Sequence, residues 1–539
     1  MTSMIETGRG ESTVEMRNRN RYVDTFSDFS PEEMESLCQV KRFIECYEGD
    51  RDFRKALDDD GNFSDDQRKM LKDIGVTFEP EELSLLWEQP SFNAEFSHHA
   101  FPVDTFEELP TEIHETLAGY PRLRVWFLWR FRRENIGFVQ KKMVLATPSV
   151  SKEYTVWRAR RIATTRNELG SYGWDIDHPC HAVEMAVGCS VGCHFCAFDA
   201  PKLQTVYDVS VPENQAMVAG VAQGMADVLG WPAAHGMLYW STEPHDNPHY
   251  VKLLEIWQSI TGASLCTATA RAKEDWVGEL IGFYSKVPAP WPRISVLSRN
   301  IMRRLHKTFT PSEMRDTILL MQQADAEVFR AKVPGGRERM LQQLVESDDL
   351  RNIDTDNPPE GFDVPQGSIA CVSGLLVNMV TRSVRLISPC YTTLENRYGY
   401  RVFDEATFED GEDFKRVLEK MVARSMVTGP YQEMPMKWRD DLKFVEQEDG
   451  FALISPTTRR DFRRGTLHLV TGALISEGTL TYGEVFDQLS DHPEIGPMAA
   501  MAMLDNLFSN GYLCEMAITQ DYRARKEAEN PSLLDVEIA

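Results

Sequence analysis

The chain of 539 residues has no long apolar run and no excess of basic residues. No stretch approaches the roughly 18 consecutive apolar residues of a membrane-spanning helix, so we expect no membrane contact. The first residues, MTSMIETGRGESTVEMRNRNRY, lack the apolar core of a secretory signal peptide, which favours a cytoplasmic location. The 83 acidic residues outnumber the 58 basic ones and give a formal net charge of −25. Because little positive charge is available to neutralise phosphates, we expect no nucleic-acid partner.

Cysteine is scarce, with ten residues in the whole chain, but three of the ten lie in VGCSVGCHFCAF, as Cys189, Cys193 and Cys196. In a reducing cytoplasm such thiols serve metal binding or catalysis more often than disulfides. A structural zinc site usually takes four ligands as two separated pairs, and no nearby Cys or His pair completes one, although His194 lies in the loop. A [4Fe–4S] cluster held by three thiolates keeps one iron open for an outside ligand, which is the interpretation we favour.

Short apolar strands alternate with helices around this cluster of cysteines. Expected strands lie at 181–188, 236–244, 262–270 and 293–300, and expected helices between them at 247–261 and 274–286. Such alternation predicts a parallel sheet with right-handed crossovers, and thus an α/β fold. The first strand leads directly into the cysteines, which chance clustering of buried thiols does not explain.

The C-x3-C-x2-C spacing, with the aromatic Phe195 before the last cysteine, resembles the signature of the radical S-adenosylmethionine (radical SAM) superfamily. The resemblance implies a partial (β/α)6 barrel, here with an N-terminal helical region and a C-terminal winged-helix-like module. It also implies that Cys189, Cys193 and Cys196 hold a [4Fe–4S] cluster whose open iron is chelated by S-adenosylmethionine. Reductive cleavage of that cofactor releases a 5′-deoxyadenosyl radical.

The family resemblance also assigns cofactor-binding positions on the later strands. Glu243, in YWSTEP, matches the glutamate that follows a Gly-Gly turn and contacts the methionine ammonium; Ser241 and Thr242 replace the glycines, which leaves the backbone contacts open. Positions that bind ribose and carboxylate in the family are occupied by Thr267, Thr269, Ser295, Ser298 and Arg299. The structural alternatives are a helix-start carboxylate for Glu243, ordinary strand hydroxyls, and a surface arginine.

A closer resemblance extends over residues 180–405. The segments GCSVGCHFC, STEPHDNPHY, RLHKTFTPSEM, IACVSGLLVNMV and VRLISPC are similar to those of radical epimerases that mature ribosomally made peptides of the proteusin type. In that family the adenosyl radical removes the Cα hydrogen of an L-residue, and a cysteine thiol returns hydrogen to the opposite face, giving a D-residue. The implied partners are a precursor peptide with a leader sequence and an electron donor such as flavodoxin or ferredoxin.

Two cysteines are candidate hydrogen donors, Cys371 in SIACVSG and Cys390 in LISPC. Both flank strands expected just after the barrel, in an arrangement similar to the twitch extension that carries an auxiliary cluster. The remaining cysteines of that extension are missing, so we expect free thiols, and the sequence does not separate the two. Cys266 is the next candidate, and like Cys180 it has the alternative role of a small buried hydrophobe.

The flanking segments are expected to capture substrate. Residues 38–90 resemble Nif11-like helical leader segments, or else form a plain helical cap, and residues 451–517 resemble a winged-helix leader-recognition domain, or else serve dimerisation or structure. A strand edge of this tail would accept an extended leader peptide. The expected divisions are a disordered tail (1–28), a Nif11-like region (29–95), a helical linker (96–170), the barrel (171–370), a twitch-like extension with a helical connection (371–450), the winged-helix-like module (451–518) and an acidic tail (519–539).

Two rival functions remain at this point. Another radical SAM peptide-modifying enzyme, for C-methylation or thioether formation, would be expected to show a cobalamin-binding domain or a complete auxiliary-cluster cysteine set, and neither is visible. A non-catalytic metal-cluster protein that binds the peptide is the rival from a different class. Glu243 and the polar residues at the strand ends speak against the non-catalytic alternative.

Overall fold

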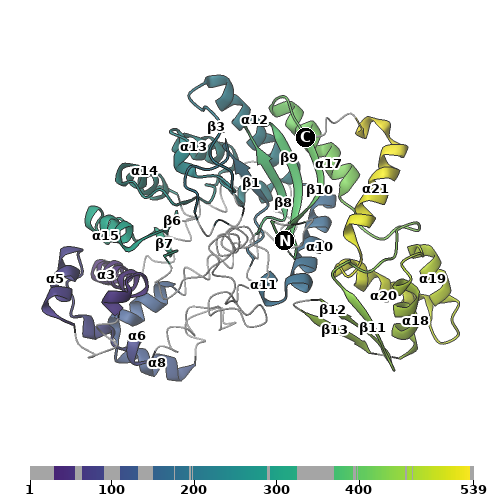
Figure 1. The fold of residues 1–539 in the computed structure, drawn as a ribbon, viewed down its shortest axis with the longest axis horizontal. Coiled ribbons are helices and arrows are strands. Elements are labelled where there is room, and N and C mark those ends of the chain that lie inside the picture. The colour runs from purple at the N-terminus through teal and green to yellow at the C-terminus, as the bar shows by residue number, and fades with distance from the viewer. Residues whose placement is uncertain are drawn as a thin grey trace, which may run out of the picture. The chain divides into compact units, whose positions relative to one another are not determined.

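The computed structural model is a mixed α/β structure, as the sequence predicts (Figure 1). Contacts between residues divide the chain into two compact units, the first built from residues 1–146 and 243–331 and the second from 147–242 and 332–539. The expected barrel range, 171–370, therefore contributes to both units. The structure describes residues 29–54, 63–89, 110–130, 150–174, 176–193, 196, 198, 200–287, 292–323, 370–391, 396, 398–455, 458–463 and 465–534. Among these, no helix is both long enough and apolar enough to cross a membrane.

The first unit contains a parallel sheet of three strands with helical crossovers. Strands β5 (Ala268–Thr269), β6 (Arg293–Val296) and β7 (Ile318–Met321) pair in this order. Helix α14 (Glu274–Tyr284) connects β5 to β6, and α15 (Arg299–Thr308) connects β6 to β7; the 3-10 helix η5 (Pro244–Asp246) and helix α13 (Tyr250–Thr261) precede β5. The predicted strand and helix positions are confirmed here, with strands shorter than the apolar runs that predicted them.

Helices from the N-terminal region complete the core of this sheet. Their bounds are α3 (Pro31–Gly49), α5 (Asp65–Asp73), η2 (Pro80–Leu83), α6 (Leu85–Glu88) and α8 (Thr111–Ala118). Ser30 caps helix α3, and its side chain forms a reciprocal capping box with that of Glu33. Its apolar side, including Phe43, belongs to one buried cluster with Met302 of α15 and Met321 of β7.

The second unit contains a five-stranded mixed sheet. Its order is β10 (Tyr400–Thr407), β9 (Ser383–Pro389), β8 (Gly374–Asn378), β1 (His181–Glu184) and β4 (Gly236–Met237). Strand β1 runs parallel to both β4 and β8, whereas β8, β9 and β10 are antiparallel neighbours. The hairpin expected from residues 368–390 is confirmed as β8 and β9. The helices of this part are α10 (Lys152–Leu169), α11 (Ser171–Trp174), α12 (Pro212–Leu229), η4 (Trp231–Ala234) and α17 (Gly411–Ser425).

A module with its own core follows within the second unit. An antiparallel sheet of β11 (Lys443–Gln447), β12 (Gly450–Ile454) and β13 (Arg459–Arg463) precedes α18 (Thr466–Ser476), α19 (Tyr482–Ser490) and α20 (Pro497–Ser509). Helix α20 buries one face, and its Leu504, Leu507 and Phe508 all lie in the module core. Helix α21 (Glu515–Glu529) and η7 (Pro531–Leu533) continue beyond the boundary expected at 518. Buried Ile518 anchors α21 in the module core.

Candidate functional site

The loop that carries the three clustered cysteines is anchored at both ends. Strand β2 (Ala186–Val187) pairs with β3 (Thr205–Val206), and the backbone of Cys189 exchanges hydrogen bonds with Pro201 (2.9 Å) and Leu203 (3.1 Å). Gly188 makes this closure possible, because its φ is +84° and a Cβ there would lie 2.4 Å from the Lys202 carbonyl oxygen. The chain therefore leaves β1 and presents the cysteines on a short, closed loop.

The thiols of Cys189, Cys193 and Cys196 are partly exposed. The Val191 amide lies 3.5 Å from the Cys189 sulfur, the kind of N–H···S contact that supports cluster thiolates. In the ranges that the structure covers, no three His, Cys, Asp or Glu side chains converge closely enough to hold a metal ion. Phe195 and its neighbour His194 lie outside the described residues. The donor chemistry fits an iron–sulfur cluster, although the thiols do not meet around one point here.

Buried polar side chains meet at the carboxyl ends of β1, β4 and β8, beside the cysteine loop. The Glu184 carboxylate ends β1 and accepts hydrogen bonds from the Ser241 amide (3.1 Å) and hydroxyl (2.6 Å). Its other oxygen accepts one from the Asn378 side-chain amide (3.1 Å) at the end of β8. Ligand sites of parallel α/β sheets form at this edge. Sequence reasoning identified Ser241 but missed Glu184 and Asn378; a carboxylate closing a buried apolar strand was the available signal.

Aromatic rings extend this site along the sheet. Phe198, two residues after Cys196, lies 4.7 Å from Trp240 between ring centroids, and Trp240 lies 6.2 Å from Tyr400 of β10. Burial raises the pKa of Tyr400; Arg385 opposes this rise, and the negative charge of Glu184 adds to it. The Arg385 guanidinium and the Glu184 carboxylate therefore both act on the Tyr400 hydroxyl, in opposite directions. The rings of Phe198, Trp240 and Tyr400 thus form a row from the cysteine loop to β10, the edge strand of the five-stranded sheet.

Glu243 lies in the first unit, where its carboxylate is already well bonded. It accepts hydrogen bonds from the His245 amide (3.0 Å), the Ala270 amide (2.9 Å) and the Thr269 hydroxyl. Burial raises its pKa, and these three hydrogen bonds oppose the rise. Glu243 thus caps η5, the helix-start role given above as its structural alternative. It also binds the end of β5 through Thr269 and Ala270.

The other predicted cofactor positions differ in their surroundings. Thr267, just before β5, is buried, and its hydroxyl lies 2.9 Å from the Tyr250 hydroxyl and 2.7 Å from the Tyr284 hydroxyl. Ser295 is half-buried in β6, and Ser298 precedes α15 without a side-chain bond to that helix. Thr242, in the second unit, is half-buried.

Arg299 is ion-paired to the N-terminal region. Its guanidinium contacts Asp50 (3.4 Å) and the exposed Asp52, and Asp50 also binds Arg303 (Nε to Oδ2, 3.0 Å). At the other end of α15, Arg42 donates to the carbonyls of His306 (2.8 Å) and Phe309 (2.9 Å). The described part of the N-terminal region is therefore an integral part of the first unit.

A buried acid–base pair also joins α3 to α15. His306 Nε2 lies 3.0 Å from the Glu45 carboxylate, and His306 Nδ1 lies 3.5 Å from the Cys46 sulfur. Burial lowers the pKa of His306 to about 4, against the opposing effect of Glu45. Burial alone would raise the pKa of Glu45, but Lys41 and His306 together lower it to about 2. Burial raises the pKa of Cys46 to about 12, so this Cys–His–Glu arrangement holds a neutral thiol and is not a nucleophilic site.

The structure separates the two candidate hydrogen donors. Cys390 is fully buried and lies near Arg401 and Glu168, and burial raises its pKa to about 12. Its neighbour Pro389 pairs with Tyr400, so alternation along the extended chain turns Cys390 toward the opposite sheet face, against α10. Cys371, just before β8, is partly exposed. A thiol that delivers hydrogen to a bound peptide must be reachable, which favours Cys371.

The remaining cysteines differ in their burial. Cys38, Cys46, Cys180 and Cys514 are buried, whereas Cys266, in the first unit, is partly exposed.

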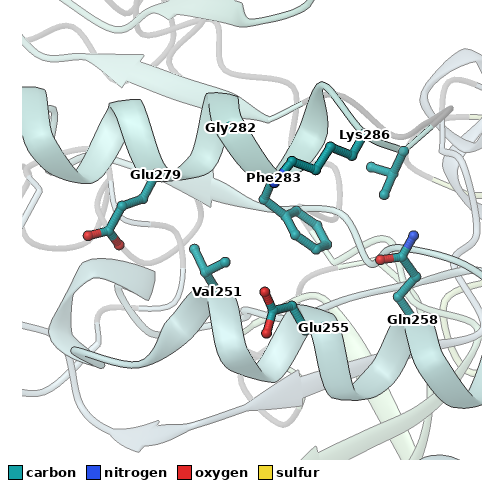
Figure 2. A pocket seen from close by; sticks show the side chains of 8 residues that line it. Val251, Glu255, Gln258, Glu279, Gly282, Phe283 and Lys286 are labelled. Carbon is teal, nitrogen blue, oxygen red and sulfur yellow. The ribbon is translucent and has the colours of Figure 1, made fainter.

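A pocket of about 410 Å³ lies between α13 and α14 (Figure 2). Figure 2 shows Val251, Glu255 and Gln258 on one helix facing Phe283 and Lys286 on the other. None of the predicted site residues lines this pocket. We therefore do not assign it to the candidate site.

The chain is similar to a protein of Sinorhizobium fredii (strain NBRC 101917 / NGR234) described as uncharacterized protein y4wI. The two are 27% identical over 498 residues, which cover 91% of this chain and 90% of the relative. The similarity extends through both compact units, and the relative's name assigns no function. No protein-family model matches the chain, and no solved structure matches it.

Proposed function

We propose that the protein is a radical SAM epimerase that converts L- to D-residues in a ribosomally synthesised precursor peptide. The observation that carries the proposal is the anchored, partly exposed loop of Cys189, Cys193 and Cys196 directly after a parallel strand. These thiolates would hold a [4Fe–4S] cluster. When bound, the cluster and S-adenosylmethionine supply a 5′-deoxyadenosyl radical, which takes a Cα hydrogen from the peptide.

The order of elements supports a partial (β/α)6 barrel as the finer fold. Strand β1, helix α12 and strand β4 form one parallel unit, and β5, α14, β6, α15 and β7 continue the alternation. We propose that these strands share one barrel whose carboxyl ends carry the cofactor. Glu243, Ser241, Thr242, Thr267, Thr269, Ser295, Ser298, Arg299 and Phe195 remain the proposed cofactor-binding positions.

The proposed role of Cys371 is to return hydrogen. A peptide Cα radical is planar, so the face that meets the donor sets the configuration of the product. The Cys371 S–H bond breaks, its hydrogen atom forms the new Cα–H bond, and a thiyl radical remains on the enzyme. One electron and one proton then restore the thiol, with a flavodoxin- or ferredoxin-type protein as the electron source. Cys390 is the weaker candidate because it is buried on the other face of the sheet.

The tail module suits capture of the leader peptide. Strand β13 is an edge of its sheet within the described residues, and its arginines give it a positive character in a chain of net charge −25. Arg460 and Arg463 are exposed on this edge, and Met498 and Met501 are exposed at the start of α20. An extended leader can add a strand to such an edge. We propose that the leader is acidic where it meets β13.

The test is iron content and S-adenosylmethionine cleavage in the anaerobically reconstituted protein. We expect about four irons per chain and 5′-deoxyadenosine formation in the presence of dithionite. Replacing Cys189, Cys193 and Cys196 together by Ala should abolish both, whereas the control Cys514→Ala should change neither. One zinc and no iron in the protein purified without air would contradict the proposal. Cluster binding without 5′-deoxyadenosine would instead favour the non-catalytic peptide-binding alternative.

A further inference from the structure

We propose that Glu184, together with the rings of Trp240 and Tyr400, binds an organic cation of the S-adenosylmethionine molecule. This inference rests on the proposed function and adds a residue that the sequence comparison with the family does not supply. The cation is either the sulfonium or the ammonium group, and the experiment below distinguishes them.

Glu184 is a buried acid that has no cationic partner among the residues described by the structure. Its side chain is almost inaccessible, with 4% of the residue exposed. Within the described part of the chain, its partners are the Ser241 amide and hydroxyl and the Asn378 amide, and no Lys, Arg or His nitrogen lies within 4.0 Å. Buried carboxylates are normally paired with a cation. A carboxylate offers about four lone-pair positions, and three are used here, so one remains.

The surroundings fit an organic cation better than a metal ion. No group of three metal-ligating side chains includes Glu184 among the residues that the structure describes. Trp240 precedes Ser241, and its ring makes an edge-to-face contact with the Tyr400 ring at an interplanar angle of 66°. Aromatic faces attract organic cations such as ammonium and sulfonium groups, and the Trp240 ring belongs to the residue next to Ser241, which binds Glu184. Tyr400 is half-buried, and its ring also stacks on Tyr398 (6.3 Å between centroids).

The alternative is a purely structural role, in which Glu184 ties Ser241 and Asn378 to the end of β1. The two roles differ in how they respond to the charge of a ligand. Loss of a structural tie weakens every ligand of the site alike, because the site itself is displaced. Loss of a charge partner weakens cationic ligands and spares an uncharged ligand that binds through the shared adenosyl group.

Three ligands that share the adenosyl group and differ in charge separate these outcomes in equilibrium binding to the reconstituted full-length protein. S-adenosylmethionine carries both cations, S-adenosylhomocysteine carries the ammonium alone, and methylthioadenosine carries neither. For Glu184→Gln we expect at least about a tenfold loss of S-adenosylmethionine affinity, the size of one charge-assisted contact, and less than about a threefold loss for methylthioadenosine. An equal loss for S-adenosylhomocysteine assigns the ammonium, and an unchanged affinity assigns the sulfonium.

Two substitutions of Tyr400, one that keeps an aromatic ring and one that removes it, provide a second test if Glu184→Gln does not fold. Tyr400→Phe keeps the aromatic face and should bind S-adenosylmethionine as the parent does. Tyr400→Leu should lose several-fold in S-adenosylmethionine affinity and keep its methylthioadenosine affinity, as expected for a cation–π contact. Parallel losses for all three ligands in both Glu184→Gln and Tyr400→Leu would overturn the inference in favour of the structural role.

The failure of this inference is distinguishable from failure of the proposed function. A parent protein that binds S-adenosylmethionine no better than methylthioadenosine would count against the proposed function itself. A parent protein with clear preference for S-adenosylmethionine, and a Glu184→Gln variant with the same preference, would refute only the role of Glu184.

Discussion

Alanine substitutions at Cys371 and Cys390 should have opposite consequences, although the sequence leaves the two residues equivalent. Cys371→Ala should stop formation of the D-residue while 5′-deoxyadenosine continues to form, because hydrogen abstraction does not need the donor. Cys390→Ala should leave the D-residue yield within about twofold of the parent, because this thiol faces α10 on the far side of the sheet from Tyr400.

The cost of Cys390→Ala should instead appear in stability. The side chain is fully buried, and its loss removes one sulfur atom, comparable in size to one or two methylene groups. At about 0.8 kcal/mol for each group, plus a small cavity term, the expected destabilisation is about 1–2 kcal/mol. Cys371 is partly exposed, so its substitution should change stability by less than about 0.5 kcal/mol.

The assay combines three measurements on the same reconstituted preparations. Thermal unfolding reports the stability difference, chromatography reports 5′-deoxyadenosine, and chiral amino-acid analysis of the hydrolysed peptide reports the D-residue. With a pKa of about 12, only about one Cys390 thiol in ten thousand is ionised at pH 8, so iodoacetamide should label Cys371 and spare Cys390 in the folded protein. A D-residue made by Cys371→Ala but not by Cys390→Ala would refute the assignment.

Three further predictions concern the scaffold and the leader. Asp404→Ala should cost about 3–5 kcal/mol, measured by denaturant unfolding, because it leaves the buried Arg424 without its carboxylate partner (2.7 Å); a cost below 1 kcal/mol would contradict this. The first unit should lose stability as the pH falls from about 6.5 to about 4, because His306 is kept neutral when folded and takes a proton when unfolded. In His306→Gln the melting temperature should depend less on pH over this window. The same pH dependence in the variant as in the parent would refute the assignment. Replacing Arg460 and Arg463 by Glu should weaken precursor binding, and the loss should be larger at low salt. The rate of 5′-deoxyadenosine formation measured in the absence of peptide should not change. A precursor affinity equal to that of the parent would exclude β13 as the docking edge.

Local features of the chain were predictable from the sequence because their causes are local. The capping box at Ser30 depends on a residue three positions away, and the strands at 181–184 and 293–296 follow from short apolar runs. The tail helices likewise follow from their periodic apolar faces, as Leu504 and Leu507 illustrate.

Features that depend on distant parts of the chain were not predictable. Glu184 meets Asn378 across 194 residues of sequence, and Arg299 meets Asp52 across 247, so no periodicity or spacing signals either contact. The difference between Cys371 and Cys390 is set by strand register and by the packing of α10, which a sequence of alternating apolar residues does not determine. The cysteine spacing is the basis of the proposed chemistry, whereas the polar residues around the loop became visible only in the fold.

The most direct test of the epimerase proposal is the mass of the product made in heavy water. The protein is co-expressed with a precursor peptide encoded beside its gene, and the peptide is analysed by mass spectrometry after proteolysis. Each inverted residue should gain one mass unit, because the exchangeable hydrogen of the Cys371 thiol has become deuterium and the original Cα hydrogen has left in 5′-deoxyadenosine. D-residues without deuterium, or a modified peptide with a mass gain of a methyl group or the loss of two hydrogens, would contradict the account.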